Sequence, residues 1–456
     1  MQQKQIVAIV VVAIIAIAAC AVVLTNNNKN NNEQPGTYNG ESPVLSIIGN
    51  ADGDEKLDSA DIAIIKDVIS KNGTAADYPN CDANQDGKIT DEDVACVQNL
   101  IDGKATKANV ICLDKSGNTV AVEVSYPLTK VATFTSNINA DILMCGGENR
   151  VSAYNSVSYD NLESKLISVD GVVDLGGSSM KFAFDKFIEE DGKTHFGALI
   201  VDASRKGNIT DDQYNTMSTS GIPVLVVKTV SMEEQLSTII TLGYLFGADT
   251  YANAKNIWDI SQPVLKTMSD AINSLTDSEK KKVIGVIMGY MLMDKDSENY
   301  VNIEEAGAMP LYKVDDSFKS IISTGSSVKI NTGENQLANY DDKIDSLISV
   351  RSIDRSADKT AADSEIVTQW EKYQKYFNKL DCYKDLVYVN SLLPGVVKVA
   401  YMLENLYPDK VSAGFGDEVF QKFITACPDY LGGCTVDNMI TIFTYDDYNA
   451  IKNASD

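Results

Sequence analysis

Short apolar runs alternate with amphipathic stretches along most of this chain. Such runs predict buried strands at residues 131–134, 198–201 and 224–227. Apolar residues at helical spacing predict helices at residues 138–144, 182–188 and 232–246. Two more apolar runs, at 110–113 and 120–124, flank a Gly-Asn pair and predict a hairpin. Strands that alternate with helices are typical of parallel sheets with crossover helices.

The second half of the chain repeats this alternation after a long stretch without glycine. Residues 249–273 carry apolar or aromatic side chains at helical spacing and predict one long helix, with Pro263 as the point where it would bend. Beyond it, the pattern predicts strands at 283–288, 347–350 and 386–389 and a helix at 396–406. The predicted fold class is α/β, with two Rossmann-like lobes joined by one long helix.

Two acidic loops near the N-terminus are copies of one another, and each precedes apolar residues at helical spacing. Loop 1 (residues 50–61) and loop 2 (residues 82–93) carry oxygen side chains at positions 1, 3, 5 and 12, and position 7 offers a backbone carbonyl. This donor set suits Ca²⁺, which accepts many oxygens in flexible geometry. The alternative is a pair of solvated acidic turns. The predicted ligands of two calcium ions are Asn50, Asp52, Asp54, Lys56, Asp58 and Asp61 in loop 1, and Asp82, Asn84, Asp86, Lys88, Thr90 and Asp93 in loop 2.

Loop 1 departs from the calcium pattern at two positions. Asn50 stands at position 1, where Asp is usual, and Glu55 stands at position 6, where Gly normally takes the left-handed turn. A left-handed Glu would cost roughly 1 kcal/mol. We therefore expect loop 2 to bind calcium more tightly than loop 1.

The duplicated loops, the position-12 Asp and the single helix after each loop resemble a type I dockerin, the calcium module that binds cohesin domains. The resemblance covers about residues 45–105 and implies a small all-α module. Dockerins recognise their partners through loop positions 10 and 11, which are Ser59 and Ala60 in loop 1 but Asp91 and Glu92 in loop 2. This difference weakens the case for a symmetric cohesin contact. The sequence leaves open whether the module binds a cohesin or packs on its own chain.

Residues 6–24 form an unbroken apolar run preceded by Lys4, which is long enough to cross a bilayer. A retained signal anchor, a cleaved signal peptide and a lipoprotein signal ending at Cys20 all fit this run. The anchor is favoured because the run continues beyond Cys20. Residues 1–25 are thus a signal anchor or signal peptide, and the Asn-rich residues 26–44 a flexible linker. The rest of the chain is predicted to be extracytoplasmic and membrane-tethered.

Charge and composition exclude several classes of function. A formal charge of −25 argues against nucleic-acid binding, which needs a basic surface. The single histidine, His195, and the lack of a C-x-x-C motif leave little material for a zinc site or a histidine-dependent triad. We therefore expect no enzymatic activity. Cys81 with Cys96, and Cys427 with Cys434, are near enough along the chain to pair, but the sequence does not assign disulfides.

Several segments in order resemble the helical-backbone substrate-binding proteins of ABC importers for ferric siderophores, haem and cobalamin. They are K-V-A-T-F-T-S-N (130–137), G-G-E-N-R-V (146–151), L-G-G (175–177), G-I-P-V-L-V (221–226), L-G-Y-L-F-G (242–247) and P-G-V-V-K-V-A-Y-M-L (394–403). The resemblance covers about residues 108–425. It implies an N-lobe at 108–248, a connecting helix at 249–280, a C-lobe at 281–456, an ABC permease as partner, and a metal-chelate or tetrapyrrole ligand.

In open parallel sheets, ligands bind beyond the carboxyl ends of the strands, which here predicts a cleft between the lobes. Arg is notable because this acidic chain has only four, and its planar fork suits carboxylate or phosphate groups. The alternative for each Arg is an exposed surface position or an ion pair. The predicted ligand-binding residues at strand ends are Thr135, Ser136, Asn137, Gly177, Ser178, Arg205, Tyr290, Arg351 and Arg355.

The leading hypothesis is an extracytoplasmic receptor that delivers an iron chelate, cobalamin or a related metal cofactor to an ABC importer. The alternative is a cell-surface interaction protein that docks to cohesin-bearing partners through its dockerin. Ligand binding in the predicted cleft would distinguish the two.

Overall fold

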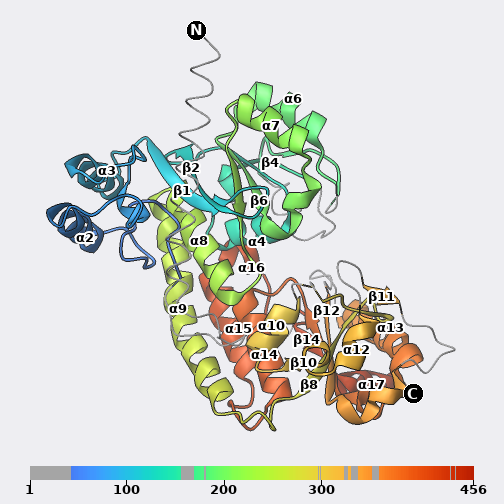
Figure 1. The fold of residues 1–456 in the computed structure, drawn as a ribbon. Coiled ribbons are helices and arrows are strands. Elements are labelled where there is room, and N and C mark those ends of the chain that lie inside the picture. The colour runs from blue at the N-terminus through green and yellow to red at the C-terminus, as the bar shows by residue number, and fades with distance from the viewer. Residues whose placement is uncertain are drawn as a thin grey trace. The chain divides into compact units, whose positions relative to one another are not determined.

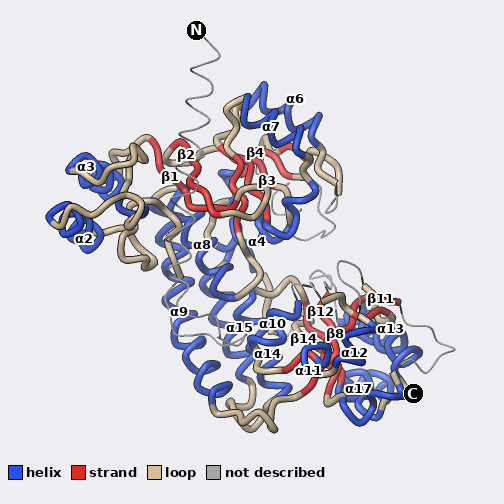
Figure 2. Tube along the Cα trace, in the orientation of Figure 1, coloured by secondary structure: helices blue, strands red, loops and turns tan. Residues whose placement is uncertain are grey.

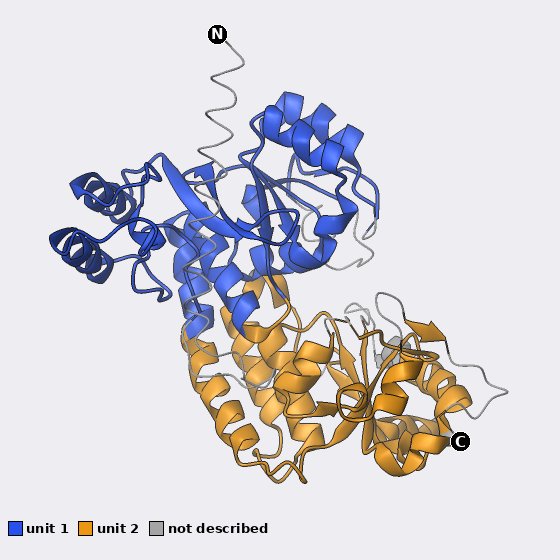
Figure 3. Cartoon of the chain, viewed as in Figure 1, with its two compact units in different colours: residues 1–33, 42–229, 233–258 blue, residues 34–41, 230–232, 259–456 orange. Residues whose placement is uncertain are grey.

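The computed structural model describes residues 43–155, 169–178, 181–295, 297, 299–322, 327–329, 337–351, 359–431, 433–436 and 438–455. Within these residues the chain forms two compact units: unit 1 contains residues 43–229 and 233–258, and unit 2 contains residues 230–232 and 259–455 (Figure 3). The predicted signal segment, nearly all of the predicted linker and Arg355 lie outside the described residues. None of the helices in the described part is long and apolar enough to span a bilayer.

Unit 1 contains a sheet with the strand order β2-β1-β7-β6-β3-β4-β5 (Figures 1 and 2). The strands are β1 (Lys107–Leu113), β2 (Thr119–Ser125), β3 (Val131–Thr133), β4 (Val151–Tyr154), β5 (Val173–Asp174), β6 (Ala198–Asp202) and β7 (Val224–Val227). From β7 to β5 all neighbours are parallel, whereas the β1–β2 hairpin joins β7 in antiparallel orientation. Every residue of β6 and β7 is buried, as expected for parallel strands covered on both faces. The hairpin and the three strands predicted here are confirmed.

The helices of unit 1 include the three predicted ones and another that was not predicted. They are α4 (Ser136–Met144), α6 (Phe184–Thr194), α7 (Asp211–Thr219) and α8 (Met232–Phe246), with 3-10 turns η2 (Glu148–Arg150) and η3 (Ala203–Asn208). α7 is the helix that was not predicted, and α6 ends six residues later than predicted. α6 begins later than predicted because Phe182 packs in the core, with its ring centroid 5.1 Å from that of Phe134 and 5.3 Å from that of Phe187. The predicted long helix is α9 (Ala248–Asn273), with Pro263 inside it, which begins in unit 1 and ends in unit 2.

The two acidic loops of unit 1 each lead into a helix, as predicted. These helices are α2 (Ser59–Ser70) and α3 (Asp91–Ile101), which pack against each other, with the 3-10 turn η1 (Pro79–Cys81) between them in the sequence. Both begin with a capping box: Asp58 and Thr90 are the N-caps, and the N3 residues Asp61 and Asp93 accept from the N-cap backbone. Loop positions 9 and 12 therefore start the helices as well as belonging to the predicted calcium sites.

Unit 2 contains a second sheet with the order β11-β9-β8-β12-β13-β14, and β10 pairs with β8. Its strands are β8 (Lys282–Ile287), β9 (Met291–Leu292), β10 (Met309–Pro310), β11 (Val328–Lys329), β12 (Ser346–Arg351), β13 (Leu386–Asn390) and β14 (Ile442–Phe443). β8, β12 and β13 are parallel, and they are the three strands predicted from the apolar runs. The α/β fold class with two sheets is thereby confirmed.

The helices of unit 2 surround an aromatic core. They are α10 (Asn299–Glu305), α11 (Leu311–Val314), α12 (Asp316–Ile321), α13 (Lys359–Phe377), α14 (Gly395–Leu406), α15 (Phe415–Ala426), α16 (Pro428–Leu431) and α17 (Tyr445–Ser455), with 3-10 turns η4 (Ala338–Lys343) and η5 (Asp381–Asp385). Trp370 of α13 lies against Tyr448 of α17, and Tyr388 of β13 stacks on Phe443 of β14 with 4.2 Å between ring centroids. Such aromatic pairs stabilise the core beyond the effect of burying their surface.

The structure also tests the expected backbone conformation of Glu55 and the suggested disulfide pairs. The left-handed conformation expected of Glu55 is wrong, because Glu55 is not among the residues with a positive φ. The seven described cysteines form no disulfide, so neither suggested pair is bonded.

Candidate functional site

The turn from β3 into α4 places Thr135, Ser136 and Asn137 at the carboxyl end of a central parallel strand of unit 1. Thr135 is the N-cap of α4, but its side chain makes no capping hydrogen bond. Its hydroxyl Oγ1 is buried and has no hydrogen-bond partner among the described residues. Leaving a buried hydroxyl unpaired costs about 1–3 kcal/mol. Together with the free N–H groups of the first helical turn, it forms a set of donors that could bind an oxyanion.

The loop after β5 holds Gly177 and Ser178, and Asn155 fixes its shape. The buried Asn155 follows β4 directly, and its Nδ2 donates to the carbonyls of Ser178 at 2.8 Å and Lys181 at 3.2 Å. Its Oδ1 accepts from the Ala183 N–H at 2.9 Å. Gly177 has a φ of 92°, and a Cβ there would lie 2.5 Å from the Lys181 carbonyl oxygen, so only glycine fits. Sequence reasoning missed Asn155 because β4 was not recognised as a strand.

Arg205 lies in η3, directly after β6, and is half-buried. β6 is the neighbour of β3 and runs parallel to it, so Arg205 and Thr135 follow adjacent strands at the same edge of the sheet. Asp202 at the end of β6 is buried, and its carboxylate accepts from the N–H of Ser204 at 2.8 Å and from the hydroxyl of Thr229. These bonds assign Asp202 a structural role in holding the turn that carries Arg205.

In unit 2, Tyr290 and Arg351 lie at the carboxyl ends of the parallel strands β8 and β12. Tyr290 follows a turn in which Met288 has a φ of 57° and Gly289 a φ of 76°. The Tyr290 ring packs on Tyr376 of α13 with 5.8 Å between centroids, and the Lys329 ammonium lies 5.8 Å from the same ring. Arg351 ends β12 and is half-buried, and its carbonyl accepts from the Ser391 N–H at 3.0 Å.

Met288 is a feature that the sequence did not predict. A positive φ is uncommon for a residue other than glycine, asparagine or aspartate, and it costs of order 1 kcal/mol or more. The Met288 side chain is nevertheless 44% exposed, so burial does not explain its conformation. Met288 and Tyr290 together give this edge of unit 2 a thioether and an aromatic ring at the solvent surface.

Loop 2 has donors that fit a calcium ion. Asp82 and Asp93 are buried, and none of the ion pairs among the described residues involves Asp82, Asp86 or Asp93. Burial raises the pKa of the Asp82 carboxyl, and the negative charge of Asp93 raises it further. Backbone N–H groups of Asp86 and Gly87 donate to Asp82 at 3.1 and 2.9 Å, which shapes the loop around its acidic side chains. A cation would relieve this repulsion.

The donor set of loop 2 includes an amide, a hydroxyl and a carbonyl as well as carboxylates. Among the described residues, no cluster of three or more His, Cys, Asp or Glu side chains is arranged to hold a metal ion. A calcium site in loop 2 therefore depends on Asn84, Thr90 and the Lys88 carbonyl in addition to Asp82, Asp86 and Asp93.

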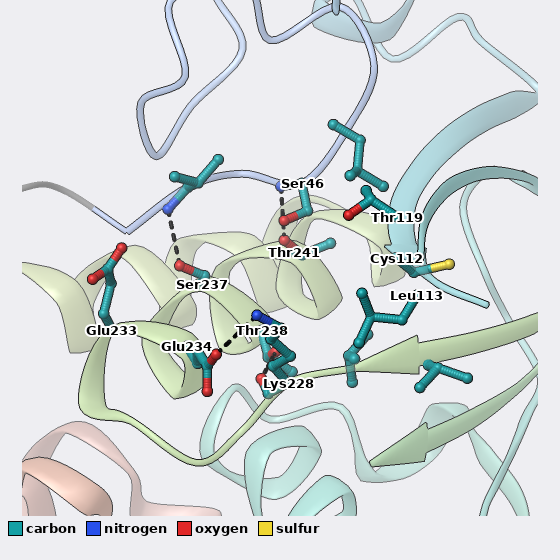
Figure 4. Close-up of a pocket in the computed structure, with 14 residues that line it drawn as sticks. Ser46, Cys112, Leu113, Thr119, Lys228, Glu233, Glu234, Ser237, Thr238 and Thr241 are labelled. Atoms are coloured by element: carbon teal, nitrogen blue, oxygen red, sulfur yellow. Dashed lines mark hydrogen bonds and ion pairs between the residues drawn. The ribbon is translucent and has the colours of Figure 1, made fainter. Parts of the chain in front are cut away.

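Unit 1 also has a cavity of about 210 Å³ that none of the predicted ligand-binding residues lines. It lies where residues 44–46 pass between β1 and the first turns of α8 (Figure 4). Leu113 and Val226 contribute to its apolar wall, and Ser237, Thr238 and Thr241 of α8 contribute hydroxyls. The Thr238 hydroxyl donates to the Lys228 carbonyl at 2.6 Å, and that of Thr241 accepts from Ser46. The hydroxyls of Thr238 and Thr241 therefore bond to the backbone of Lys228 and Ser46.

Comparisons with known proteins find similarities for the two acidic loops with their helices and for the two-sheet region. Residues 49–102 match the family model of the dockerin type I domain. The structure is similar to that of the TroA-like periplasmic binding protein FepB from Veillonella parvula, with a TM-score of 0.55 and 11% identity, covering 73% of this chain and 99% of that one. A search of curated proteins finds no match.

Two further solved structures have lower scores. The molybdate periplasmic binding protein MolA from Haemophilus influenzae gives a TM-score of 0.49 at 10% identity, covering 69% of this chain and 97% of that one. An ABC transporter solute binding protein from Sulfurospirillum deleyianum gives 0.49 at 14% identity, covering 72% and 98%. Residues 49–102 thus match the dockerin type I family, and the two-sheet α/β region shares the fold of the TroA-like binding protein from Veillonella parvula.

Proposed function

We propose that this protein is an extracytoplasmic solute-binding receptor of an ABC importer, and that it is not an enzyme. The observation that carries the proposal is the buried, unpaired hydroxyl of Thr135 at the carboxyl end of β3. A polar group held without a partner at the edge where α/β sheets bind ligands is suited to complete its hydrogen bonding with a solute. The fold shared with a TroA-like periplasmic binding protein supports this assignment.

The proposed solute is a metal chelate that is anionic or carries anionic groups, such as a ferric siderophore, haem or cobalamin. In unit 1, Thr135, Ser136, Asn137, Gly177, Ser178 and Arg205 would contact it, and in unit 2, Tyr290, Arg351 and Arg355 would do so. Arg side chains bind carboxylates through charge-assisted hydrogen bonds, and Tyr290 offers a flat apolar face. Three of the four arginines of this acidic chain are in this proposed set.

Thermal-shift screening of the full chain against ferric catecholates, ferric hydroxamates, haem and cobalamin tests the proposal. A solute present at 100 times its dissociation constant adds about 2.7 kcal/mol to the free energy of unfolding, which is a clear rise in melting temperature. A rise with one chelate class supports the receptor. No rise with any of them, together with tight capture by a cohesin, would instead favour a cell-surface interaction protein.

For the dockerin domain we propose calcium binding and a cohesin-bearing partner at the cell surface. The residues at loop positions 10 and 11, Ser59 and Ala60 in one copy and Asp91 and Glu92 in the other, are exposed at the starts of α2 and α3. Pull-down of the full chain on immobilised cohesin, in Ca²⁺ and in EDTA, tests the partner. Capture that depends on Ca²⁺ is expected, and equal recovery on a column without cohesin would contradict it. We also propose that residues 6–24 tether the protein to the membrane.

A further inference from the structure

The first residue of each loop in the dockerin domain accepts backbone N–H bonds, but only that of loop 1 also donates. In loop 2 the Asp82 carboxylate accepts two backbone N–H bonds. In loop 1 the Oδ1 of Asn50 accepts only one, from Gly53 at 3.1 Å, and its Nδ2 donates to the carbonyls of Leu45 at 2.8 Å and Asp54 at 2.7 Å. Asn50 is 1% exposed, and its bond to the Leu45 carbonyl is buried, whereas that to the Asp54 carbonyl is partly buried. A carboxylate cannot donate these bonds, which explains why Asn replaces the usual Asp.

The backbone of loop 1 also lacks one turn that loop 2 makes. Position 4 has a positive φ in both loops, at Gly53 and Gln85. Position 6 has a positive φ only in loop 2, where Gly87 is at 88°, and not at Glu55 of loop 1. In calcium loops of this type, glycine at position 6 makes the sharp turn that wraps the ligands around the ion. The backbone of loop 1 therefore differs from that of loop 2 at position 6.

Protein groups supply the contacts of loop 1 instead. The Tyr251 hydroxyl of α9 donates to the Glu55 carbonyl at 3.1 Å. The Lys56 ammonium lies 3.2 Å from Asp54 and 3.0 Å from Asp58, so a positive charge already accompanies these carboxylates. Lys88, the matching residue of loop 2, takes part in none of the ion pairs among the described residues.

Loop 1 is joined to the receptor sheet through residues 44–48. Ile47 bridges to Val110 of β1, the Ile111 N–H donates to the Ser46 carbonyl at 2.8 Å, and the Ile48 N–H donates to the Asn109 carbonyl at 2.8 Å. On the other side, the Val44 and Ser46 N–H groups each donate to hydroxyls of α8, on Ser237 and Thr241, at 3.0 Å (Figure 4). The Asn50 amide connects loop 1 to this same segment through Leu45.

We propose that loop 1 is a calcium-independent joint that fixes the dockerin domain to the receptor sheet of unit 1, and that loop 2 alone binds calcium. Asn50, Lys56 and Tyr251 provide in loop 1 what the ion provides in loop 2. The dockerin domain then remains attached to the receptor when calcium is removed, and only loop 2 and the start of α3 respond to the ion. The inference uses the calcium site proposed for loop 2 as its reference.

Native mass spectrometry of the full chain, titrated with CaCl₂ after EDTA treatment, measures the number of ions bound. We expect one Ca²⁺ per chain, none after Asp82→Asn, and still one after Asp52→Ala at position 3 of loop 1. Two ions, or loss of an ion on Asp52→Ala, would overturn the inference and leave the calcium site of loop 2 standing. No bound ion would overturn the calcium proposal for loop 2 as well.

The substitution Asn50→Asp separates a joint from a weak calcium site in a second way. It restores the usual ligand, so a calcium site would gain an ion and a higher melting temperature in Ca²⁺. If loop 1 is a joint, Asn50→Asp removes the two hydrogen bonds that the Asn50 amide donates. We then expect the melting temperature to fall by about 5 °C both in Ca²⁺ and in EDTA. Tyr251→Phe, which removes one hydroxyl, should lower melting in the same calcium-independent way by a smaller amount. A calcium-dependent gain in Asn50→Asp would contradict the joint.

Discussion

The strand-end edges of the two sheets differ in the chemistry that they present. In unit 1 the edge consists of the first turn of α4, the Thr135 hydroxyl and a glycine turn held by Asn155. In unit 2 the edge carries the Tyr290 ring, the Met288 thioether and Arg351. Small donors suit an oxyanion, and a ring with a cation suits a flat, charged surface. If both edges bind the proposed solute, each predicts a different response to substitution.

The largest effect is expected from Arg351→Ala in unit 2. Loss of a charge-assisted hydrogen bond to an anionic solute costs about 1.5–3 kcal/mol, or about 10- to 100-fold in dissociation constant. Arg150 is the matched control. It lies in η2, before the amino end of β4, whereas the proposed ligand-binding residues follow the carboxyl ends of strands. Equal affinities of Arg351→Ala and Arg150→Ala in titration calorimetry would remove Arg351 from the site.

Gly177→Ala tests the unit 1 edge through its backbone. The new Cβ would clash with the Lys181 carbonyl and with Asn155 Oδ1, at 2.5 and 2.6 Å, so the loop must move. We expect a loss of about 2 kcal/mol in the free energy of unfolding of unit 1 and weaker solute binding. Gly176, with a φ of 76° and open space around it, is the control and should lose only about 1 kcal/mol. Denaturant unfolding followed by solute titration measures both, and equal losses would contradict the role of Asn155.

Tyr290→Ala should discriminate between classes of solute. Removing the ring should weaken binding of planar aromatic chelates and haem by about 10-fold, or ~1.4 kcal/mol. Tyr290→Phe retains the ring and its packing on Tyr376, and should bind almost as the wild type does. A competition assay that shows the same loss for aromatic and non-aromatic chelates would indicate that Tyr290 acts through the fold.

Thr135→Val has the smallest expected effect and the most specific signature. Valine has nearly the same shape, so the unliganded protein should become more stable by about 1 kcal/mol because an unpaired buried hydroxyl is removed. Solute affinity should fall by about 5-fold, because the bond completed by the solute is lost. Chemical denaturation and calorimetry give the two values. Lower stability together with unchanged affinity would mean that the hydroxyl serves the fold.

The sequence predicted much of this architecture because its strands are apolar on both faces. The run at 224–227 matches β7, in which every residue is buried, and the helical spacing of apolar residues at 232–246 matches α8. The short strand β4 was missed, and with it Asn155, because a four-residue strand has too few positions to show a period. The order of Thr135, Gly177 and Arg205 along one edge followed from the parallel topology alone.

Other features depend on contacts that a local pattern does not contain. The pairing of residues 46–48 with β1 joins segments far apart in sequence. The Asn50 amide donates to Leu45, next to this paired segment, which explains why Asn stands at position 50. The sequence alone indicated only an imperfect calcium ligand there. Met288 adopts a left-handed conformation that its residue type disfavours, and no rule of spacing identified it.

Titration calorimetry of the full chain with the chelate found by thermal-shift screening tests the central claim most directly. The receptor assignment predicts saturable binding of one solute per chain, weakened by Arg351→Ala and by Thr135→Val but not by Arg150→Ala. Absence of saturable binding for every chelate class, or a solute whose affinity is the same in all three variants, would contradict it.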